Sequence, residues 1–172
     1  MVAAGCIGTD TVRVVVIPTP HLSSSTTLSP ICDSVLFSYA PSSFTTGVGF
    51  NWSRSAVSGI APSSSSGTGS ISETLINSTG SPIPVVYTYT LTVGGCLNIE
   101  NMTVTVKPFT TAGAISGVDT VCEGATITLA DAIAGGTWSS GSNVTVTGGV
   151  VTGIAAGPDV VSYTVTDSCG TA

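Results

Sequence analysis

Hydrophobic and polar residues alternate in short runs along most of the chain, and clusters of Gly, Pro, Ser and Asn separate the runs. In Tyr87–Val93 the large residues occupy every second position with Thr between them, which places them on one face of a strand. Runs that recur at intervals of about eight to twelve residues are typical of a β-sandwich or barrel. No window of helical period competes with them. The segment Ser63–Gly67 is predicted to be a flexible loop between strands.

The predicted strands fall into two series with a leading segment. They are Thr9–Ile17, then Ser34–Tyr39, Gly47–Ser53, Ser70–Ile76, Val85–Val93 and Asn101–Val106, then Ala125–Leu129, Gly136–Ser139, Asn143–Val146, Val150–Ile154 and Val160–Thr166. We therefore predict an all-β fold of two tandem Ig-like β-sandwiches, preceded by an orphan strand at the N-terminus.

One pattern occurs three times: a Cys that follows Gly or Ser leads towards a run rich in Thr and Val. The three occurrences begin at Cys6, Cys96 and Cys169. The first two end at Pro18 and Pro108, and proline cannot continue a central strand. The third stops at Ala172, before its strand begins. These boundaries predict an orphan final strand with a Pro linker over 1–20, one sandwich over 21–108, and a second over 109–172 that lacks its last strand.

Composition narrows the possible functions. The chain has 3 Lys+Arg and 9 Asp+Glu, a net charge of −6 and 7% charged residues, against about 25% in ordinary domains. With so few charged side chains, the hydroxyl groups of 25 Ser and 27 Thr are expected to keep the surface hydrated. Three basic residues cannot neutralise a phosphate backbone, which excludes nucleic-acid binding. A single His and scattered acids leave little material for catalysis, so we predict no enzyme activity and no cofactor.

The chain also bears on cellular location. No apolar run approaches the roughly 20 residues that a membrane helix needs, so we expect no membrane insertion. The first residues, Met1–Cys6, have neither a basic nor an apolar signal-peptide region. Five cysteines with few charges are nevertheless typical of an extracellular protein. We expect a secreted or cell-surface chain that is a mature product or an excerpt of a longer one.

At several motifs the sequence resembles tandem domains of giant secreted bacterial surface proteins. Residues 21–108 resemble a PKD-like domain and residues 110–172 a bacterial Ig-like domain. The motifs that carry the resemblance are Phe50–Trp52, Tyr87–Thr90, Cys96–Pro108, Ala114–Gly117, Val121–Cys122, Gly135–Ser140, Gly149–Gly157 and Ser162–Thr166. The resemblance implies β-sandwich modules of extracellular adhesins and stalk-like repeats. We expect a structural module or subunit of an extracellular filament, stalk or adhesin. The alternative is an adhesive module that binds a glycan or a surface.

The cysteines admit three interpretations: a metal site, a nucleophile or disulfides. A zinc site lacks a close pair of cysteines and a second His, and a nucleophile lacks a nearby base. Cys32 and Cys122 each precede the second strand of a unit, and Cys96 and Cys169 each precede its last strand. These parallel positions predict the disulfides Cys32–Cys96 and Cys122–Cys169, with Cys6 unpaired or bonded between subunits.

Other residue types suggest weaker hypotheses. Trp52 and Trp138 are expected in the two cores rather than on an exposed sugar-binding platform. His21 is expected to be a solvated linker residue. A calcium site between the two domains is a further hypothesis. Its candidate ligands are the carboxylates of Asp119, Glu123, Asp159 and Asp167, because calcium binds several oxygen atoms. The Asp-Ser/Thr-Val triads suggest O-glycosylation at Thr11, Ser34 and Thr120.

The two irregular ends of the chain are complementary. An orphan strand precedes the first sandwich, and the second sandwich is expected to expose an open core and unpaired backbone groups. Two explanations stay open: one copy donates its strand to the next copy in a head-to-tail filament, or the chain is a window from a longer tandem repeat whose neighbouring domains supply the strand. The predicted donor residues are Thr9, Thr11, Val12, Val14, Val16 and Ile17.

Overall fold

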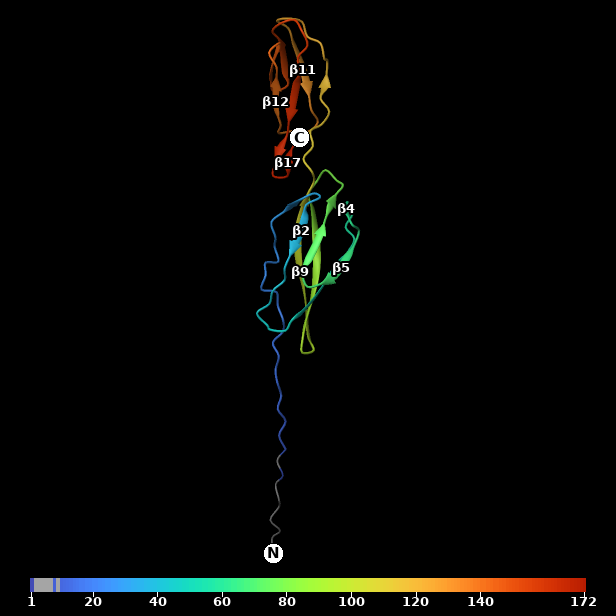
Figure 1. The fold of residues 1–172 in the computed structure, drawn as a ribbon, viewed down its shortest axis with the longest axis vertical. Helices are drawn as coiled ribbons and strands as arrows, with labels where there is room; N and C mark the ends of the chain where they lie inside the picture. The colour runs from blue at the N-terminus through green and yellow to red at the C-terminus, as the bar shows by residue number, and fades with distance from the viewer. Residues whose placement is uncertain (2–7, 9) are drawn as a thin grey trace.

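The computed structural model covers residues 1–172 and describes Met1, Gly8 and residues 10–172. Two Ig-like β-sandwiches lie end to end along one long axis, and residues 10–17 extend from the far end of the first sandwich (Figure 1). This arrangement confirms the all-β prediction. The described residues form no helix that is long and apolar enough to span a membrane. Thr9 and Cys6 lie outside the described residues.

The first sandwich is built on a five-stranded sheet with the order β1-β9-β8-β3-β5. Its strands are β1 (Ile31–Cys32), β9 (Cys96–Lys107), β8 (Ile83–Val93), β3 (Gly49–Arg54) and β5 (Ser65–Thr68). The long strands β8 and β9 form an antiparallel hairpin, and β1 runs parallel to the end of β9. The strands outside this sheet pair in twos: β2 (Leu36–Tyr39) with β6 (Ile71–Thr74), and β4 (Ile60–Ala61) with β7 (Ile76–Asn77).

Strand periodicity decides which side chains form the core of the first sandwich. Tyr87, Tyr89 and Leu91 are fully buried, whereas the threonines between them are half-buried. On the next strand Met102, Val104 and Val106 are fully buried as well. Trp52 is 7% exposed and its ring meets that of Tyr87 edge-on at 5.7 Å. The expected inner face of this sandwich is confirmed.

A buried ion pair lies within the first sandwich. Arg54 Nε donates to Glu73 Oε2 at 3.2 Å, and the Tyr87 hydroxyl donates to the same carboxylate. The Arg54 and Glu73 side chains are 0% and 8% exposed. Burial acts to raise the pKa of Glu73, but the hydrogen bonds from Arg54 and Tyr87 outweigh it and hold that pKa below its ordinary value. Glu73 therefore stays ionised beside the guanidinium group.

The prediction of a flexible loop at Ser63–Gly67 is wrong. Residues Ser65–Thr68 form β5, an edge strand antiparallel to β3. Gly67 lies opposite Trp52, and a Cβ at this position would lie 2.8 Å from Cζ2 of the indole ring. The missing side chain lets the strand backbone cover the large ring, which a count of serines does not reveal.

The second sandwich pairs a four-stranded sheet of order β10-β11-β14-β13 with the two strands β12 and β15. The strands of the larger sheet are β10 (Ser116–Gly117), β11 (Thr126–Ala130), β14 (Val150–Gly153) and β13 (Val144–Thr147). The smaller sheet contains β12 (Thr137–Ser140) and β15 (Val161–Thr164), and a short hairpin of β16 (Thr166–Asp167) and β17 (Gly170–Thr171) follows it. The rings of Trp138 and Tyr163 contact each other at 4.7 Å. Both remain only half-buried, so the interior of this sandwich is more open than that of the first.

Both predicted disulfides are wrong. Cys32 is bonded to Cys169, with Cα atoms 5.4 Å apart, and this bridge joins the two sandwiches. Cys32 is the register partner of Lys107 at the end of β9, whereas Cys96 begins the same strand. A strand of 12 residues is on the order of 35 Å long at about 3.3 Å per residue, far beyond the reach of a disulfide. Cys96 and Cys122 are free thiols.

Candidate functional site

An open groove follows one side of the second sandwich. Its volume is about 940 Å³, and it is lined by residues 118–122, by residues 155–159 and by Val161 at the start of β15. Among the described residues, segment 118–122 has no strand partner and β15 pairs along one edge, with β12. Val118 at one side is 60% exposed, and the floor includes Ile127, Leu129 and Val151. A free strand edge and an unpaired segment over an apolar floor form a site of the kind that accepts a further strand.

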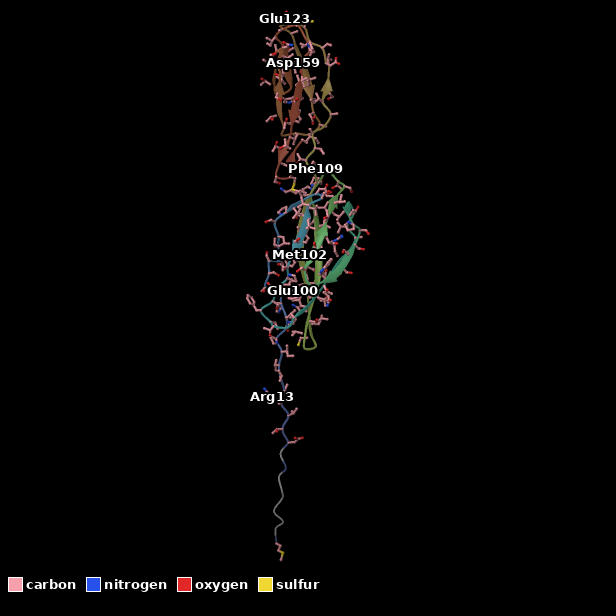
Figure 2. All side chains as sticks on the ribbon, viewed as in Figure 1. Arg13, Glu100, Met102, Phe109, Glu123 and Asp159 are labelled. Carbon is pink, nitrogen blue, oxygen red and sulfur yellow. A yellow bond between two sulfur atoms is a disulfide. The ribbon has the colours of Figure 1, made fainter. Side chains whose placement is uncertain are left out.

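The N-terminal tail presents the complementary feature. Residues 10–17 have no sheet partner in the described structure, and they point away from the first sandwich (Figure 1). Val12, Val14 and Val16 are 86%, 75% and 88% exposed. Arg13, labelled on this tail in Figure 2, separates the first two of them. An exposed stripe of alternate valines is a strand face without a core.

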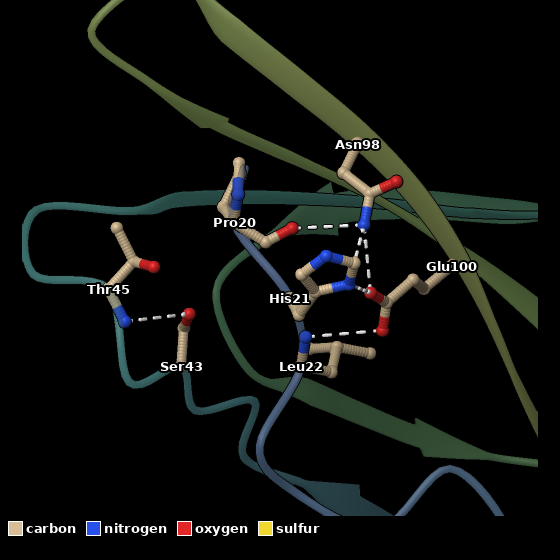
Figure 3. Close-up of polar contacts among 7 residues, drawn as sticks. All are labelled: Pro20, His21, Leu22, Ser43, Thr45, Asn98 and Glu100. Atoms are coloured by element: carbon tan, nitrogen blue, oxygen red, sulfur yellow. Dashed lines mark hydrogen bonds and ion pairs between the residues drawn. The ribbon is translucent and has the colours of Figure 1, made fainter. Parts of the chain in front are cut away.

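The base of the tail is held firmly against the first sandwich (Figure 3). Pro20 is buried, and its carbonyl accepts a hydrogen bond of 2.9 Å from the Asn98 side chain. The Glu100 carboxylate accepts from the backbone N–H of Leu22 at 3.1 Å and contacts His21 Nδ1 at 2.7 Å. His21 is exposed, as expected of a linker residue, but this contact pins it to β9. The anchor fixes the direction in which the tail leaves the sandwich.

The tail repeats the pattern of β9. Cys6–Pro18 and Cys96–Pro108 have the same length, and aligning them places Val12, Val14 and Val16 on the positions of Met102, Val104 and Val106. Those three β9 residues are fully buried against the first sandwich. The tail therefore has the side-chain pattern of a final strand, and its own chain provides no core for it among the described residues.

The groove likewise repeats the surroundings of β9. Trp52 pairs with Tyr89 on β8, and Trp138 pairs with Tyr163 on β15, so β15 corresponds to the strand that β9 covers. On the other edge of β9, Thr27 and the strand β1, which ends at Cys32, pair with β9 in parallel. Residues 118–122 occupy the corresponding place, because the carbonyl of Cys122 accepts a hydrogen bond from the N–H three residues later, as that of Cys32 does.

The acidic residues proposed as calcium ligands do not gather into one cluster. Asp119, Glu123 and Asp159 line the groove, whereas Asp167 lies at the junction of the sandwiches. Within the part of the chain that the structure describes, no group of three His, Cys, Asp or Glu side chains could hold a metal ion. Desolvation acts to raise the pKa of Asp159, but hydrogen bonds from the N–H groups of Val160, Val144 and Asn143 lower it overall. The Asp159 carboxylate thus holds the turn that leads into β13.

The junction between the sandwiches was not foreseen from the sequence. Lys107 Nζ contacts Ser168 Oγ at 2.8 Å, and the buried Thr110 donates to Asp167. That hydrogen bond, with the N–H of Cys169, holds the pKa of Asp167 below its ordinary value. Phe109 lies at this junction, and Glu123 lies at the far end of the second sandwich (Figure 2). No local motif marks these contacts, because they depend on how the sandwiches stack.

The suggested modification sites are accessible. Thr11, Ser34 and Thr120 are all exposed. Ser34 adopts a left-handed conformation with φ of 60° in the turn after β1, and Thr120 lies on one side of the groove. Accessibility is compatible with O-glycosylation, which stays a prediction.

Comparisons with known proteins give little further guidance. No protein-family model and no curated protein matches the chain. Among solved structures, the chain is similar to a chimeric titin Z1Z2 functionalized with a KLER exogenous peptide from decorin, at 13% identity, 92% coverage of this chain, 94% of that chain and a TM-score of 0.32. A likeness at this level carries no argument about function. The resemblance to PKD-like and bacterial Ig-like domains therefore stays a prediction.

Proposed function

We propose that this chain is a structural subunit of an extracellular filament, stalk or adhesin, in which copies join head to tail by strand complementation. The observation that supports the proposal most strongly is the match between the groove of the second sandwich and the unpaired tail. In this joint, residues 10–12 of one copy lie along β15 of the preceding copy, and residues 13–17 lie along its residues 118–122. The tail then runs antiparallel to β15 and parallel to 118–122, as β9 runs beside β8 and β1.

The register of the joint follows from the correspondence with β9. Tyr87 lies opposite Met102 in the first sandwich, and the same relation places Val161 opposite Val12. Val14 and Val16 then point onto the groove floor, and Arg13 and Val15 point outward. Burial of one valine contributes about 1.5 kcal/mol or more, and the backbone ladder adds hydrogen bonds. Ordering the tail opposes this gain, but the anchored base reduces the cost.

The geometry of a single chain favours an open assembly. The tail leaves one end of the molecule, and the groove lies on the second sandwich at the other end (Figure 1). Donor and acceptor are therefore different surfaces, and the contact is heterologous. A heterologous contact along the long axis gives a linear filament rather than a closed dimer. The extracellular location follows the same proposal, supported by the low charge and the disulfide.

Two neighbouring substitutions test the proposal. In the 172-residue chain, Val14→Asp places a carboxylate on the groove floor, whereas Val15→Asp places the same group on the outer face. We expect the unchanged chain and the Val15→Asp variant to form filaments visible by negative-stain microscopy, with masses in light scattering that rise with concentration. The Val14→Asp variant is expected to stay monomeric, near 16.9 kDa.

Two results would count against strand donation. The first is a chain that stays monomeric at all concentrations, and the second is assembly to the same extent with Val14→Asp as with Val15→Asp. A monomeric chain would favour the alternative in which a neighbouring domain of one longer polypeptide supplies the strand. The mass of the denatured, reduced native material distinguishes this alternative, because one longer chain is far heavier than 16.9 kDa.

A further inference from the structure

At the junction between the two sandwiches, the end of a strand lies beside a disulfide. Lys107 is the last residue of β9, and Cys32 is its register partner on β1. The turn of the β16–β17 hairpin lies against both, because Ser168 Oγ contacts Lys107 Nζ at 2.8 Å and Cys169 is bonded to Cys32. The disulfide thus joins the end of one sandwich to a turn of the sandwich that follows it.

The base of the tail has the same layout. Ile17 precedes Pro18 as Lys107 precedes Pro108, and two residues after each proline a buried residue follows, Pro20 or Thr110. The β8–β9 turn takes the place of the β16–β17 turn. Cys96 at this turn has its Sγ atom 3.7 Å from the carbonyl oxygen of Ile17. Ile17 also packs against Gly94, where a Cβ would clash with it. Cys96 is therefore held beside the last residue of the donor strand.

The acceptor end carries the other cysteine. Cys122 is exposed and free, next to Glu123 at the far end of the second sandwich (Figure 2). The backbone N–H of Ala125 donates to the Cys122 carbonyl at 3.0 Å, as that of Val35 donates to Cys32 at 3.3 Å. Each cysteine precedes the first residue of the next strand, Thr126 or Leu36, by the same number of positions. Cys122 therefore corresponds to Cys32.

We propose that Cys122 of one copy forms a disulfide with Cys96 of the next copy and locks the filament covalently. This inference rests on the proposed strand complementation. In the proposed register the donated Ile17 lies opposite Cys122, as Lys107 lies opposite Cys32 within the chain. Because Cys96 contacts Ile17 in its own chain, docking brings the two free thiols together. The joint between copies then repeats the Cys32–Cys169 joint within a copy, and Cys6 is not needed for it.

The bond forms by thiol–disulfide exchange with a small disulfide oxidant such as oxidised glutathione. The thiolate of Cys122, which is exposed, attacks one sulfur of the oxidant, forms a mixed disulfide and releases one thiolate. The Cys96 thiolate then attacks the Cys122 sulfur and releases the second thiolate. Two protein thiols are oxidised to one disulfide, and one small disulfide is reduced to two thiols, which take up the two protons that the protein thiols release. Docking accelerates the second step by raising the local thiol concentration.

Complementary variants of the 172-residue chain test the inference. After incubation in a glutathione redox buffer, the unchanged chain is expected to give a ladder in steps of 16.9 kDa on non-reducing denaturing gels. Cys96→Ser and Cys122→Ser should each remove the ladder, whereas Cys6→Ser should leave it intact. A mixture of the Cys96→Ser and Cys122→Ser chains should give covalent dimers and no higher species. Mass spectrometry should find a peptide that contains Cys96 linked to Cys122.

The readouts separate this inference from the proposed function. Light scattering without denaturant reports assembly, and the denaturing gel reports the covalent bond. Assembly without a ladder, or with a ladder that survives Cys122→Ser, would overturn the disulfide and leave strand complementation standing. A chain that remains monomeric in both readouts would overturn both. Retained assembly of the two single serine variants, together with the loss of their ladder, supports both.

Discussion

At the scale of single residues, Arg54 and Glu73 form a buried ion pair in the first sandwich. Their charges lie among the aromatic side chains, where the Arg54 guanidinium group is also 5.9 Å from the centre of the Tyr87 ring. Removing a charge from water is costly, and a partner with good geometry offsets that cost. Arg54 also donates to the carbonyls of Pro62 and Ser63, so one guanidinium group connects three segments of the chain.

We predict that Glu73→Ala lowers the free energy of unfolding by about 3 kcal/mol, because it leaves Arg54 buried without its counter-charge. Urea denaturation followed by tryptophan fluorescence measures the change. Glu123→Ala serves as the matched control, since Glu123 is exposed, and should change the midpoint little. Equal midpoints for the two variants would show that the Arg54–Glu73 pair contributes nothing to stability.

At the scale of strands, the two sandwiches are unequally complete. The first has a contiguous core in which residues from β2, β3, β6, β8 and β9 are buried. In the second, Val151 is 2% exposed, while Trp138 and Tyr163 remain half-buried. The difference has a physical cause: β9 closes the first core, and the described residues include no corresponding strand over the second. The stability of the second sandwich should therefore depend on a strand supplied from outside it.

A synthetic peptide of residues 9–18 tests this dependence. Added to the Val14→Asp chain, which cannot donate its own tail, the peptide is expected to raise the unfolding midpoint of the second sandwich and leave that of the first unchanged. At a concentration of 100 times its dissociation constant, the gain is about 2.7 kcal/mol. Hydrogen exchange resolves the two sandwiches, and protection should appear in β15 and residues 118–122. A peptide carrying Val14→Asp should have no effect, and protection in the first sandwich instead would refute the assignment.

At the scale of the whole molecule, the junction determines the relation between the two sandwiches. Domains joined by a short linker usually move relative to each other unless their interface is extensive. Here the Cys32–Cys169 bond, the Lys107–Ser168 contact and the Thr110–Asp167 hydrogen bond all act at one place. A junction held in this way suits a stalk, because it keeps successive sandwiches aligned along one axis.

We predict that the double variant Cys32→Ser/Cys169→Ser bends at the junction. In small-angle scattering of the Val14→Asp background, which keeps the chain monomeric, the distribution of interatomic distances should broaden and its long-distance tail should shorten. The double variant Cys96→Ser/Cys122→Ser provides the control and should leave the curve unchanged. Identical curves for all three proteins would mean that the non-covalent contacts alone hold the junction.

The sequence by itself determined the local structure and part of the site. Alternation in Tyr87–Val93 predicted both the strand and its buried face, because side-chain direction in a strand has a period of two. The repeated spacing from Cys to Pro predicted that residues 9–17 have the pattern of a final strand. The sequence did not predict β5. In this strand the small Gly67 makes room for the Trp52 ring, a contact that the neighbouring residues in the sequence do not indicate.

Only the tertiary structure decided which cysteines meet and how the tail leaves the first sandwich. Parallel positions suggested Cys32–Cys96, but the length of β9 separates these residues, and the stacking of the sandwiches brings Cys169 to Cys32 instead. The anchor formed by Asn98 and Glu100 was equally invisible, since its partners lie 78 positions away in the chain. Local patterns specify strands and their faces, whereas contacts between distant ends depend on the accumulated lengths and directions of all the strands between them.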